Sequence, residues 1–196
     1  SFALRPQVAP QALPTLSLVV SLAVADALER VQSHRRALIK WPNDVLCAEG
    51  KLAGISLEAL AGGVCVGVGI NVYRPAEQQK MQGKYRSAYL MSEVAQPALS
   101  SGQRSVMTQL IQQMLTAVGE RYSLWCKQGF SAFIEEYSHR FAYRDKRATL
   151  ALIDGTETIE GIIRGIDDAG RLLVENEAGS LVPMSSGEVH VTSFES

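Results

Sequence analysis

The residues best suited to chemistry lie between positions 40 and 71. The run KWPND (residues 40–44) is followed by KLAGI (residues 51–55) and then by GVGIN (residues 67–71). Lysine ammonium groups can hold an anion, an aspartate can accept a proton, and an asparagine amide offers both a donor and an acceptor. Because proline fixes its own φ and disfavours helical backbone before it, we expect extended backbone at Trp41-Pro42. The pattern predicts an anion-binding site at one edge of a sheet.

The elements that would position these residues can be read from hydrophobic periodicity and turn signals. Apolar residues at helical spacing follow Pro14 as far as residue 31, and they face most sides, which is typical of a buried helix. Glu49-Gly50 is a plausible hairpin turn. We expect strands at residues 1–4, 36–41, 45–47, 52–57 and 64–70, and further helices at residues 105–125 and 130–137, with Met and Trp in the core.

The character of the chain changes after about residue 143. Short apolar segments at residues 148–153, 157–167, 171–175 and 180–183 are separated by turn signals such as Asp154-Gly155. This spacing indicates a five-strand SH3-like barrel. We therefore predict an α+β protein with a mixed β-sheet and helices packed on it in residues 1–143, followed by a small SH3-like β-barrel in residues 144–196.

Composition excludes several classes of function. A formal net charge of −1 and a pI near 6.3 argue against a nucleic-acid partner, since phosphate binding needs clustered Lys and Arg. The three cysteines lack metal-ligand spacing and are expected to be free thiols, which suits a cytoplasmic protein. Polar residues interrupt the apolar segment 13–28, so we expect no membrane span. The histidines also lack metal-ligand spacing, so we expect no metal site.

The order and spacing of KWPND, KLAGI and GVGIN resemble the catalytic core of the biotin protein ligases. The resemblance continues to Gly187-Glu188-Val189 and so covers nearly the whole chain. It implies the fold of the class II aminoacyl-tRNA synthetases and biotin ligases. It also implies an ATP-dependent enzyme that forms biotinyl-5′-AMP and transfers biotin to a lysine of biotin carboxyl carrier protein, with ATP, biotin and Mg²⁺ as the required small molecules.

The resemblance also implies roles for single residues. Joining a carboxylate to the α-phosphate of ATP brings two anions together, and a fixed cation between them lowers that barrier. Lys51 matches the lysine with this role, and Asp44 matches an essential acid that either accepts the proton of the carrier lysine or helps position Mg²⁺. Asn43 and Asn71 match adenine contacts. An internal partner such as Glu58 would compete with substrate for Lys51.

The remaining candidates support these four residues. Lys40 is assigned to the nucleotide as supporting positive charge, and Gly54 and Gly69 let backbone approach the ligand closely. Trp41 and Gly54 are assigned with Lys51 to substrate binding. The polar segment 74–86 is a candidate lid. Glu188 is a candidate for a nucleotide contact. Some relatives also carry an arginine four residues after this glutamate, where this chain has Thr192.

Alternatives stay open at this point. The lipoate and octanoyl ligases share the broad fold but do not typically show this spacing of KWPND and KLAGI. The arginine- and glycine-rich loop of the family lies upstream of the strand that residues 1–4 resemble. We therefore expect these 196 residues alone to ligate weakly or not at all, or to act only as a folding and association module, with possible homo-oligomers formed through an exposed sheet edge. Whether a DNA-binding domain precedes the chain is not readable from it.

Overall fold

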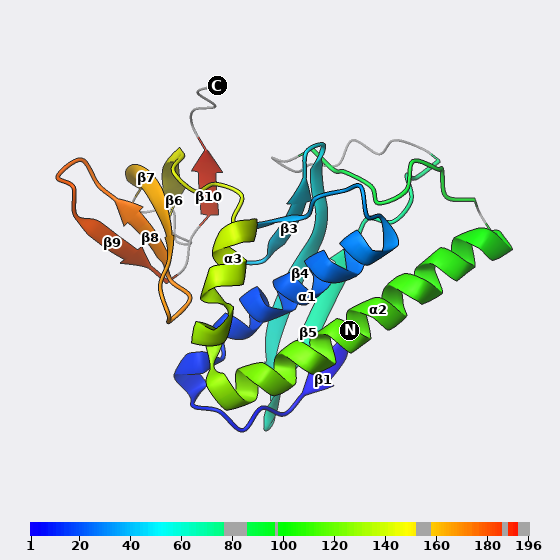
Figure 1. Ribbon diagram of the computed structural model, residues 1–196, viewed down its shortest axis with the longest axis horizontal. Coiled ribbons are helices and arrows are strands. Elements are labelled where there is room, and N and C mark those ends of the chain that lie inside the picture. The colour runs from blue at the N-terminus through cyan, green and yellow to red at the C-terminus, as the bar shows by residue number, and fades with distance from the viewer. Residues whose placement is uncertain (77–85, 97, 152–157, 186–187, 192–196) are drawn as a thin grey trace.

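The computed structural model describes residues 1–76, 86–96, 98–151, 158–185 and 188–191 (Figure 1). Two five-stranded sheets are present, one built from strands within residues 2–70 and the other from strands within residues 147–191. Helices pack against the first sheet. The predicted α+β class and the small C-terminal β region are confirmed, while the boundary at residues 143 and 144 stays a prediction.

The first sheet has the order β1-β5-β4-β3-β2, and all its neighbouring strands are antiparallel. This differs from the mixed sheet that we expected. Parallel contacts in the described part of the chain are isolated bridges, such as the one between Ile39 and Phe141. Tight turns join antiparallel neighbours, whereas parallel strands need long crossovers. The strands are β1 (Phe2–Leu4), β2 (Leu38–Lys40), β3 (Asp44–Cys47), β4 (Gly50–Leu60) and β5 (Gly63–Ile70).

The link between β2 and β3 also differs from expectation. Residues 41–43 form a turn, and the peptide bond between Trp41 and Pro42 is cis, where we expected extended backbone. The reason is the pairing of the flanking strands. Lys40 lies opposite Asp44 in the antiparallel register, so three residues must reverse the chain.

In the described part of the N-terminal region the helical elements are η1 (Pro10–Ala12), α1 (Thr15–Val31), α2 (Ser101–Gln128), η2 (Phe130–Phe133) and α3 (Ile134–Arg140). Helix α1 is buried along most of its length, as its pattern predicted. Helix α2 begins before residue 105 because Ser100 and Gln103 form a capping box, in which each backbone N–H donates to the other side chain. Trp125 is a core residue, as predicted, and its indole N–H donates to Thr15 Oγ1 at 2.9 Å.

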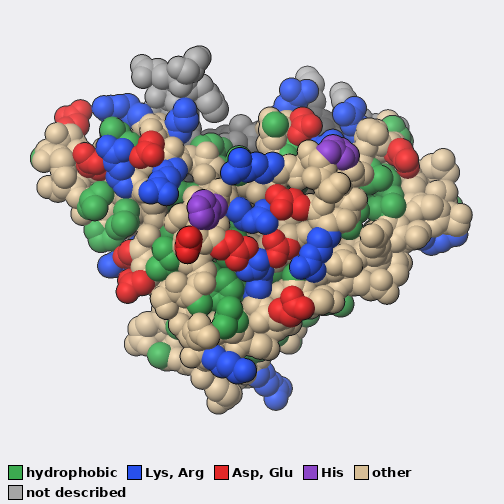
Figure 2. All heavy atoms as spheres, in the orientation of Figure 1, with side chains coloured by type: hydrophobic (Ala, Val, Ile, Leu, Met, Phe, Trp, Pro, Cys, Tyr) green, Lys and Arg blue, Asp and Glu red, His purple; other side chains and the backbone are tan. Residues whose placement is uncertain are grey.

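Five charged side chains join the three helices, and we call Asp26, Glu29, Arg121, Glu136 and Arg140 the helix charge cluster. Arg121 Nη2 lies 2.5 Å from Asp26 Oδ2 and 2.6 Å from Glu136 Oε1. Arg140 lies 2.8 Å from both Asp26 Oδ1 and Glu29 Oε1. Figure 2 shows acidic and basic side chains alternating over this part of the surface. The cluster ties α1, α2 and α3 into one layer.

The second sheet has the order β10-β6-β7-β8-β9 and is antiparallel throughout. Its strands are β6 (Arg147–Ala151), β7 (Thr158–Ile166), β8 (Leu172–Glu175), β9 (Leu181–Met184) and β10 (Glu188–Val191), close to the predicted segments. Helix α3 contacts β7, which places this sheet beside the helical layer. Among the described residues, every helix is too short or too polar to cross a membrane.

Candidate functional site

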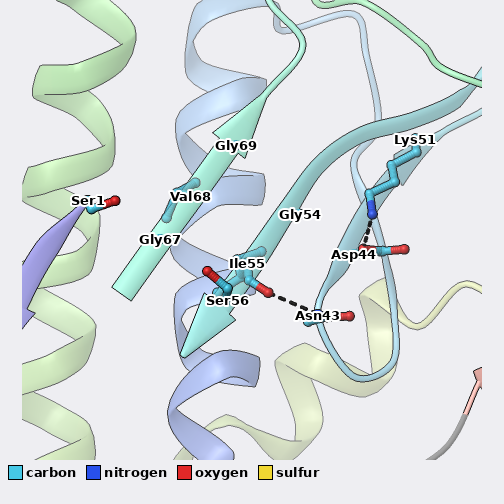
Figure 3. Close-up of a pocket in the computed structure, with 10 residues that line it drawn as sticks. All are labelled: Ser1, Asn43, Asp44, Lys51, Gly54, Ile55, Ser56, Gly67, Val68 and Gly69. Atoms are coloured by element: carbon cyan, nitrogen blue, oxygen red, sulfur yellow. Dashed lines mark hydrogen bonds and ion pairs between the residues drawn. The ribbon is translucent and has the colours of Figure 1, made fainter. Parts of the chain in front are cut away.

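A pocket of about 360 Å³ opens on the face of the first sheet that points away from α1 (Figure 3). Side chains alternate along β4, so Ala53 and Ile55 are buried on the helix side while Gly54 and Ser56 face the opening. The pocket is lined by Ser1, Asn43, Asp44, Lys51, Gly54, Ile55, Ser56, Gly67, Val68 and Gly69. Five of the predicted site residues therefore meet at one cavity.

An ion pair stands at one end of this pocket. Lys51 Nζ lies 2.5 Å from Asp44 Oδ1, and the lysine side chain is 38% exposed while the aspartate side chain is 12% exposed. Asp44 thus replaces Glu58 as the acidic partner of Lys51, because Glu58 sits opposite Cys65, well along β4 from the pair. A half-exposed ammonium beside a single carboxylate can still approach an anion in the pocket.

A bulge in β4 turns Lys51 toward the pocket. Val45 pairs with Ala53, but the next residue of β3, Leu46, pairs with Lys51, so Leu52 is left without a partner on β3. Leu52 and Ala53 are consequently both buried, and Lys51 shares the face of Asp44. Without this extra residue, strict alternation would direct Lys51 toward the helices.

Gly54 makes room for the ion pair. It pairs with Asp44 across the sheet, and a Cβ on residue 54 would lie 3.2 Å from Lys51 Nζ and 3.5 Å from Asp44 Oδ1. Gly69 lies opposite Gly54 on β5, and a Cβ there would meet only the Gly54 carbonyl oxygen, at 4.0 Å. The two glycines form an open floor between the charged end and the rest of the pocket, in keeping with their predicted role.

The backbone of Lys51 is held on both sides. Its N–H donates to Arg86 O at 2.9 Å, and its carbonyl oxygen accepts from Ala88 N at 2.9 Å and from Asn71 Nδ2 at 3.1 Å. Asn71 is therefore next to Lys51 but is not among the residues that line the pocket. Its side-chain N–H is engaged by the protein itself, so its predicted contact with adenine gains no support from this geometry.

Asn43 lines the pocket and also anchors its own loop. Its Nδ2 donates to Ile55 O at 2.9 Å, and its carbonyl oxygen accepts from Ile55 N at 2.9 Å. Figure 3 shows the amide oxygen Oδ1 on the side of the Asn43 amide that is turned away from Ile55. Asn43 can thus offer an acceptor to a ligand while its donor fixes the loop to β4.

Besides Asn71, the predicted site residues Lys40 and Trp41 do not line the pocket. Lys40 is 5% exposed at the end of β2, and Trp41 is 2% exposed, with its indole N–H donating to Gly170 O at 2.9 Å. Sequence reasoning placed both at the ligand because they belong to KWPND. Their burial follows from the turn at residues 41–43, which directs them into the protein, so a direct role in ligand binding stays a prediction without structural support.

Two residues near the pocket were not found from sequence. Ser56 of β4 lies beside Gly67 of β5, and its Oγ would be 2.5 Å from a Cβ placed on Gly67. Tyr143 lies at the start of the link to the second sheet, and burial together with the nearby charge of Asp44 raises its pKa. Neither belongs to a motif. No sequence pattern therefore marks them as site residues. Tyr143 in particular comes near the pocket only through the fold, because α2 and α3 precede it in the chain.

Some predicted features lie outside the described residues. The candidate lid at residues 74–86 is described only at residues 74–76 and 86. Glu188 belongs to β10, but its side chain is not described, and Thr192 lies beyond the described part. Their roles stay predictions.

Two protein-family models match this chain, one over the region of the first sheet and the other over the region of the second sheet. Residues 1–73 match the model of the biotin/lipoate A/B protein ligase family, and residues 149–191 match the biotin protein ligase C terminal domain. The first match contains every pocket-lining residue.

Curated relatives and solved structures agree with these matches. The chain is 32% identical to the biotin–[acetyl-CoA-carboxylase] ligase of Paracoccus denitrificans over 91% of its own length and 74% of that protein. It is 28% identical to the bifunctional ligase/repressor BirA of Salmonella typhimurium, of which it spans only 56%. The biotin protein ligase of Aquifex aeolicus has the same fold, with a TM-score of 0.78 at 23% identity over 97% of this chain and 80% of that one. The chain belongs to the biotin protein ligase family.

Proposed function

We propose that this chain carries the catalytic pocket of an ATP-dependent ligase that forms biotinyl-5′-AMP and transfers biotin to a lysine of biotin carboxyl carrier protein. The observation that supports this most is the Lys51–Asp44 pair at the end of a pocket with a glycine floor. A solved structure of the Aquifex aeolicus biotin protein ligase, with a TM-score of 0.73, is a complex with biotin and ATP.

In the first step a carboxylate oxygen of biotin attacks the α-phosphorus of ATP, and pyrophosphate leaves. Both reactants are anions, and the developing negative charge needs a cation that is already in place. Lys51 is held by its backbone bonds and its ammonium faces the cavity, so it can contact the carboxylate and the α-phosphate together. The substrate anions then compete with Asp44 for the ammonium.

In the second step the amine of the carrier lysine attacks the acyl carbon, AMP leaves, and the amine loses a proton. Asp44 can accept that proton once Lys51 has turned to the substrate. Asp44 is also the acidic residue among those that line the pocket, which suits a Mg²⁺ ion that enters with the ATP phosphates, since Mg²⁺ needs only one or two protein carboxylates there. A bound Mg²⁺ would neutralise phosphate charge.

The acid can be identified by pyrophosphate exchange into ATP. We expect the complete protein to show exchange that depends on biotin and not on lipoate or octanoate, because the chain is 32% identical to a biotin–[acetyl-CoA-carboxylase] ligase. Lipoate is the stated alternative, since the matched family includes lipoate ligases. If lipoate stimulated the exchange and biotin did not, the substrate would be lipoate and the assignment of biotin would be wrong.

The carrier and the setting can be tested with the same protein. We expect a biotin carboxyl carrier protein to gain the mass of one biotinyl group at a lysine. The three free cysteines support a reducing, cytoplasmic setting. Self-association through β1, which is an edge strand of the first sheet, stays a prediction that sedimentation would test.

A further inference from the structure

A turn of the second sheet contacts the loop that carries the pocket residues. Trp41 Nε1 donates to Gly170 O at 2.9 Å, although 129 residues separate the two. Gly170 belongs to residues 167–171, which join β7 to β8 and which we call the β7–β8 turn. Trp41 is 2% exposed and the hydrogen bond is partly buried, which makes the bond stronger than a fully exposed one.

The β7–β8 turn is braced internally. The backbone N–H of Asp167 donates to Arg171 O at 3.0 Å, and Asp167 Oδ1 accepts from Arg171 N at 2.8 Å. The Arg171 guanidinium lies 2.7 Å from Asp167 Oδ2, and Gly170 N donates to Asp167 O at 2.9 Å. The carbonyl group of Gly170 is thus presented to Trp41 by a preformed turn.

The turn is also seated closely on the N-terminus of α1. Gly170 has a φ of +75°, and a Cβ there would lie 2.8 Å from Leu18 Cδ1 and 3.0 Å from Thr15 Cγ2. Only glycine fits both the backbone conformation and the narrow gap.

Each residue of the loop 41–43 is held by a different element. Trp41 is held by the β7–β8 turn, the Pro42 carbonyl oxygen accepts from Ser17 Oγ of α1 at 3.2 Å, and Asn43 is held by Ile55 of β4. Asp44 follows directly as the first residue of β3. The second sheet therefore supplies one of three supports for the segment that bears Asn43 and Asp44.

We propose that the β7–β8 turn is a positioning element of the active site: the Gly170 carbonyl, through Trp41, fixes the loop 41–43 and with it the placement of Asn43 and Asp44. Trp41 and Gly170 touch no substrate in this scheme. The second sheet then affects turnover even though no described residue of that sheet lines the pocket. The consequence for turnover rests on the proposed ligase function.

The chain offers a matched control for this proposal. Gly179, in the turn between β8 and β9, has a φ of +76°, and a Cβ there would meet nothing within 4 Å. Gly170→Ala and Gly179→Ala should therefore carry a similar backbone cost of about 1 kcal/mol, since alanine resists positive φ. Only Gly170→Ala also pushes the turn away from α1 and Trp41.

The first readout is hydrogen exchange followed by NMR, which does not depend on activity. With two tryptophans in the chain, the Trp41 indole N–H is readily assigned. We expect Gly170→Ala to speed exchange of this N–H and of the Ile55 amide about tenfold or more, and Gly179→Ala to leave both within about twofold. Equal acceleration by the two variants, or none by Gly170→Ala, would overturn the proposal.

The second readout is the kinetics of adenylate formation by the complete protein. Gly170→Ala should lower kcat about tenfold with the KM for biotin within about twofold, because it displaces Asp44, the partner of Lys51, without removing a contact to biotin. Trp41→Phe should act in the same direction, and Gly179→Ala should match the unaltered protein. An unchanged kcat in Gly170→Ala despite faster exchange would reject the positioning role. If the unaltered protein forms no adenylate, the ligase function fails, and the exchange comparison alone decides whether the turn holds the loop.

Discussion

The helix charge cluster and the Lys51–Asp44 pair are both built from opposite charges in close contact, but they differ in how fully the cations are used. Arg121 contacts two carboxylates, and Arg140 contacts three. Lys51 has Asp44 as its one acidic partner in the part of the chain that the structure describes, and it is 38% exposed at a cavity.

This difference separates a structural cluster from a binding site. A saturated cluster gains nothing from a further anion, and removing one of its members leaves charges poorly compensated. A single pair at a pocket can exchange its carboxylate for a ligand anion at low cost. The comparison predicts that changes in the cluster reduce stability and that changes at the pair reduce activity.

The largest expected effect is on turnover at the pair. Lys51→Ala should lower the rate of adenylate formation about 10²- to 10³-fold, because it removes the cation between two reacting anions. The unfolding free energy should fall by only about 1 kcal/mol, since the Lys51 side chain is 38% exposed although that of Asp44 is 12% exposed. Single-turnover kinetics and urea unfolding of the same preparation check both parts. If the loss of unfolding free energy were as large as the loss of activity expressed as a free energy, the pair could not be distinguished from a structural cluster.

The next effect is on stability at the cluster. Asp26→Asn should cost about 2 kcal/mol of unfolding free energy, because the carboxylate of Asp26 contacts both Arg121 and Arg140, although each arginine keeps another carboxylate partner. Adenylate formation per folded molecule should stay within about twofold. Glu120→Gln, at an exposed position of α2, is the control and should be neutral. Loss of activity in folded Asp26→Asn protein would show that the helix charge cluster affects catalysis at the pocket, which would contradict this prediction.

A smaller effect is expected where the pair meets the pocket floor. Gly54→Ala should lower kcat about tenfold, because its Cβ would lie 3.2 Å from Lys51 Nζ and displace it. Gly69→Ala, its partner across the sheet, has more room and should mainly raise KM. Steady-state kinetics with varied biotin separate the two patterns, and identical patterns would argue against a specific role for Gly54.

The smallest effect concerns an exposed cluster away from the pocket. The Cys47 thiol donates to Glu49, which lowers the pKa of Glu49, and Arg35 Nη1 lies 3.3 Å from the same carboxylate. A carboxylate with a lowered pKa in the folded state contributes stability above its ordinary pKa near 4.5 that is lost as the pH falls. Because Glu49 is exposed, Glu49→Gln should cost less than about 1 kcal/mol at pH 7 and flatten the acid limb of stability only slightly. Unfolding measured from pH 3 to pH 7 tests this.

Local patterns were enough to predict most elements. The helix after Pro14, the hairpin around Glu49-Gly50 and the strands after residue 147 were found because periodicity and turn residues act over a few positions. The early start of α2 was also readable, since Ser100 and Gln103 form a capping box that could have been recognised.

Features that depend on register or on distant contacts were not predictable. The bulge at Leu52, which turns Lys51 toward the pocket, appears only when β3 and β4 are paired. The contact between Trp41 and Gly170 spans 129 residues, and Asp26 and Arg140 are 114 residues apart. The motif correctly grouped Asn43, Asp44 and Lys51, but it could not show that Lys40 and Trp41 turn inward.

The most direct test of the account is the affinity of a non-hydrolysable biotinyl-adenylate analogue, measured by calorimetry for the complete protein and for its Lys51→Ala and Asp26→Asn variants. The account predicts about 100-fold weaker binding for Lys51→Ala, because the Lys51 ammonium is available to a ligand in the pocket. It predicts unchanged binding for Asp26→Asn, because the cations that Asp26 contacts lie in the helix charge cluster and not at the pocket. Equal affinity in the unaltered protein and in Lys51→Ala would contradict it.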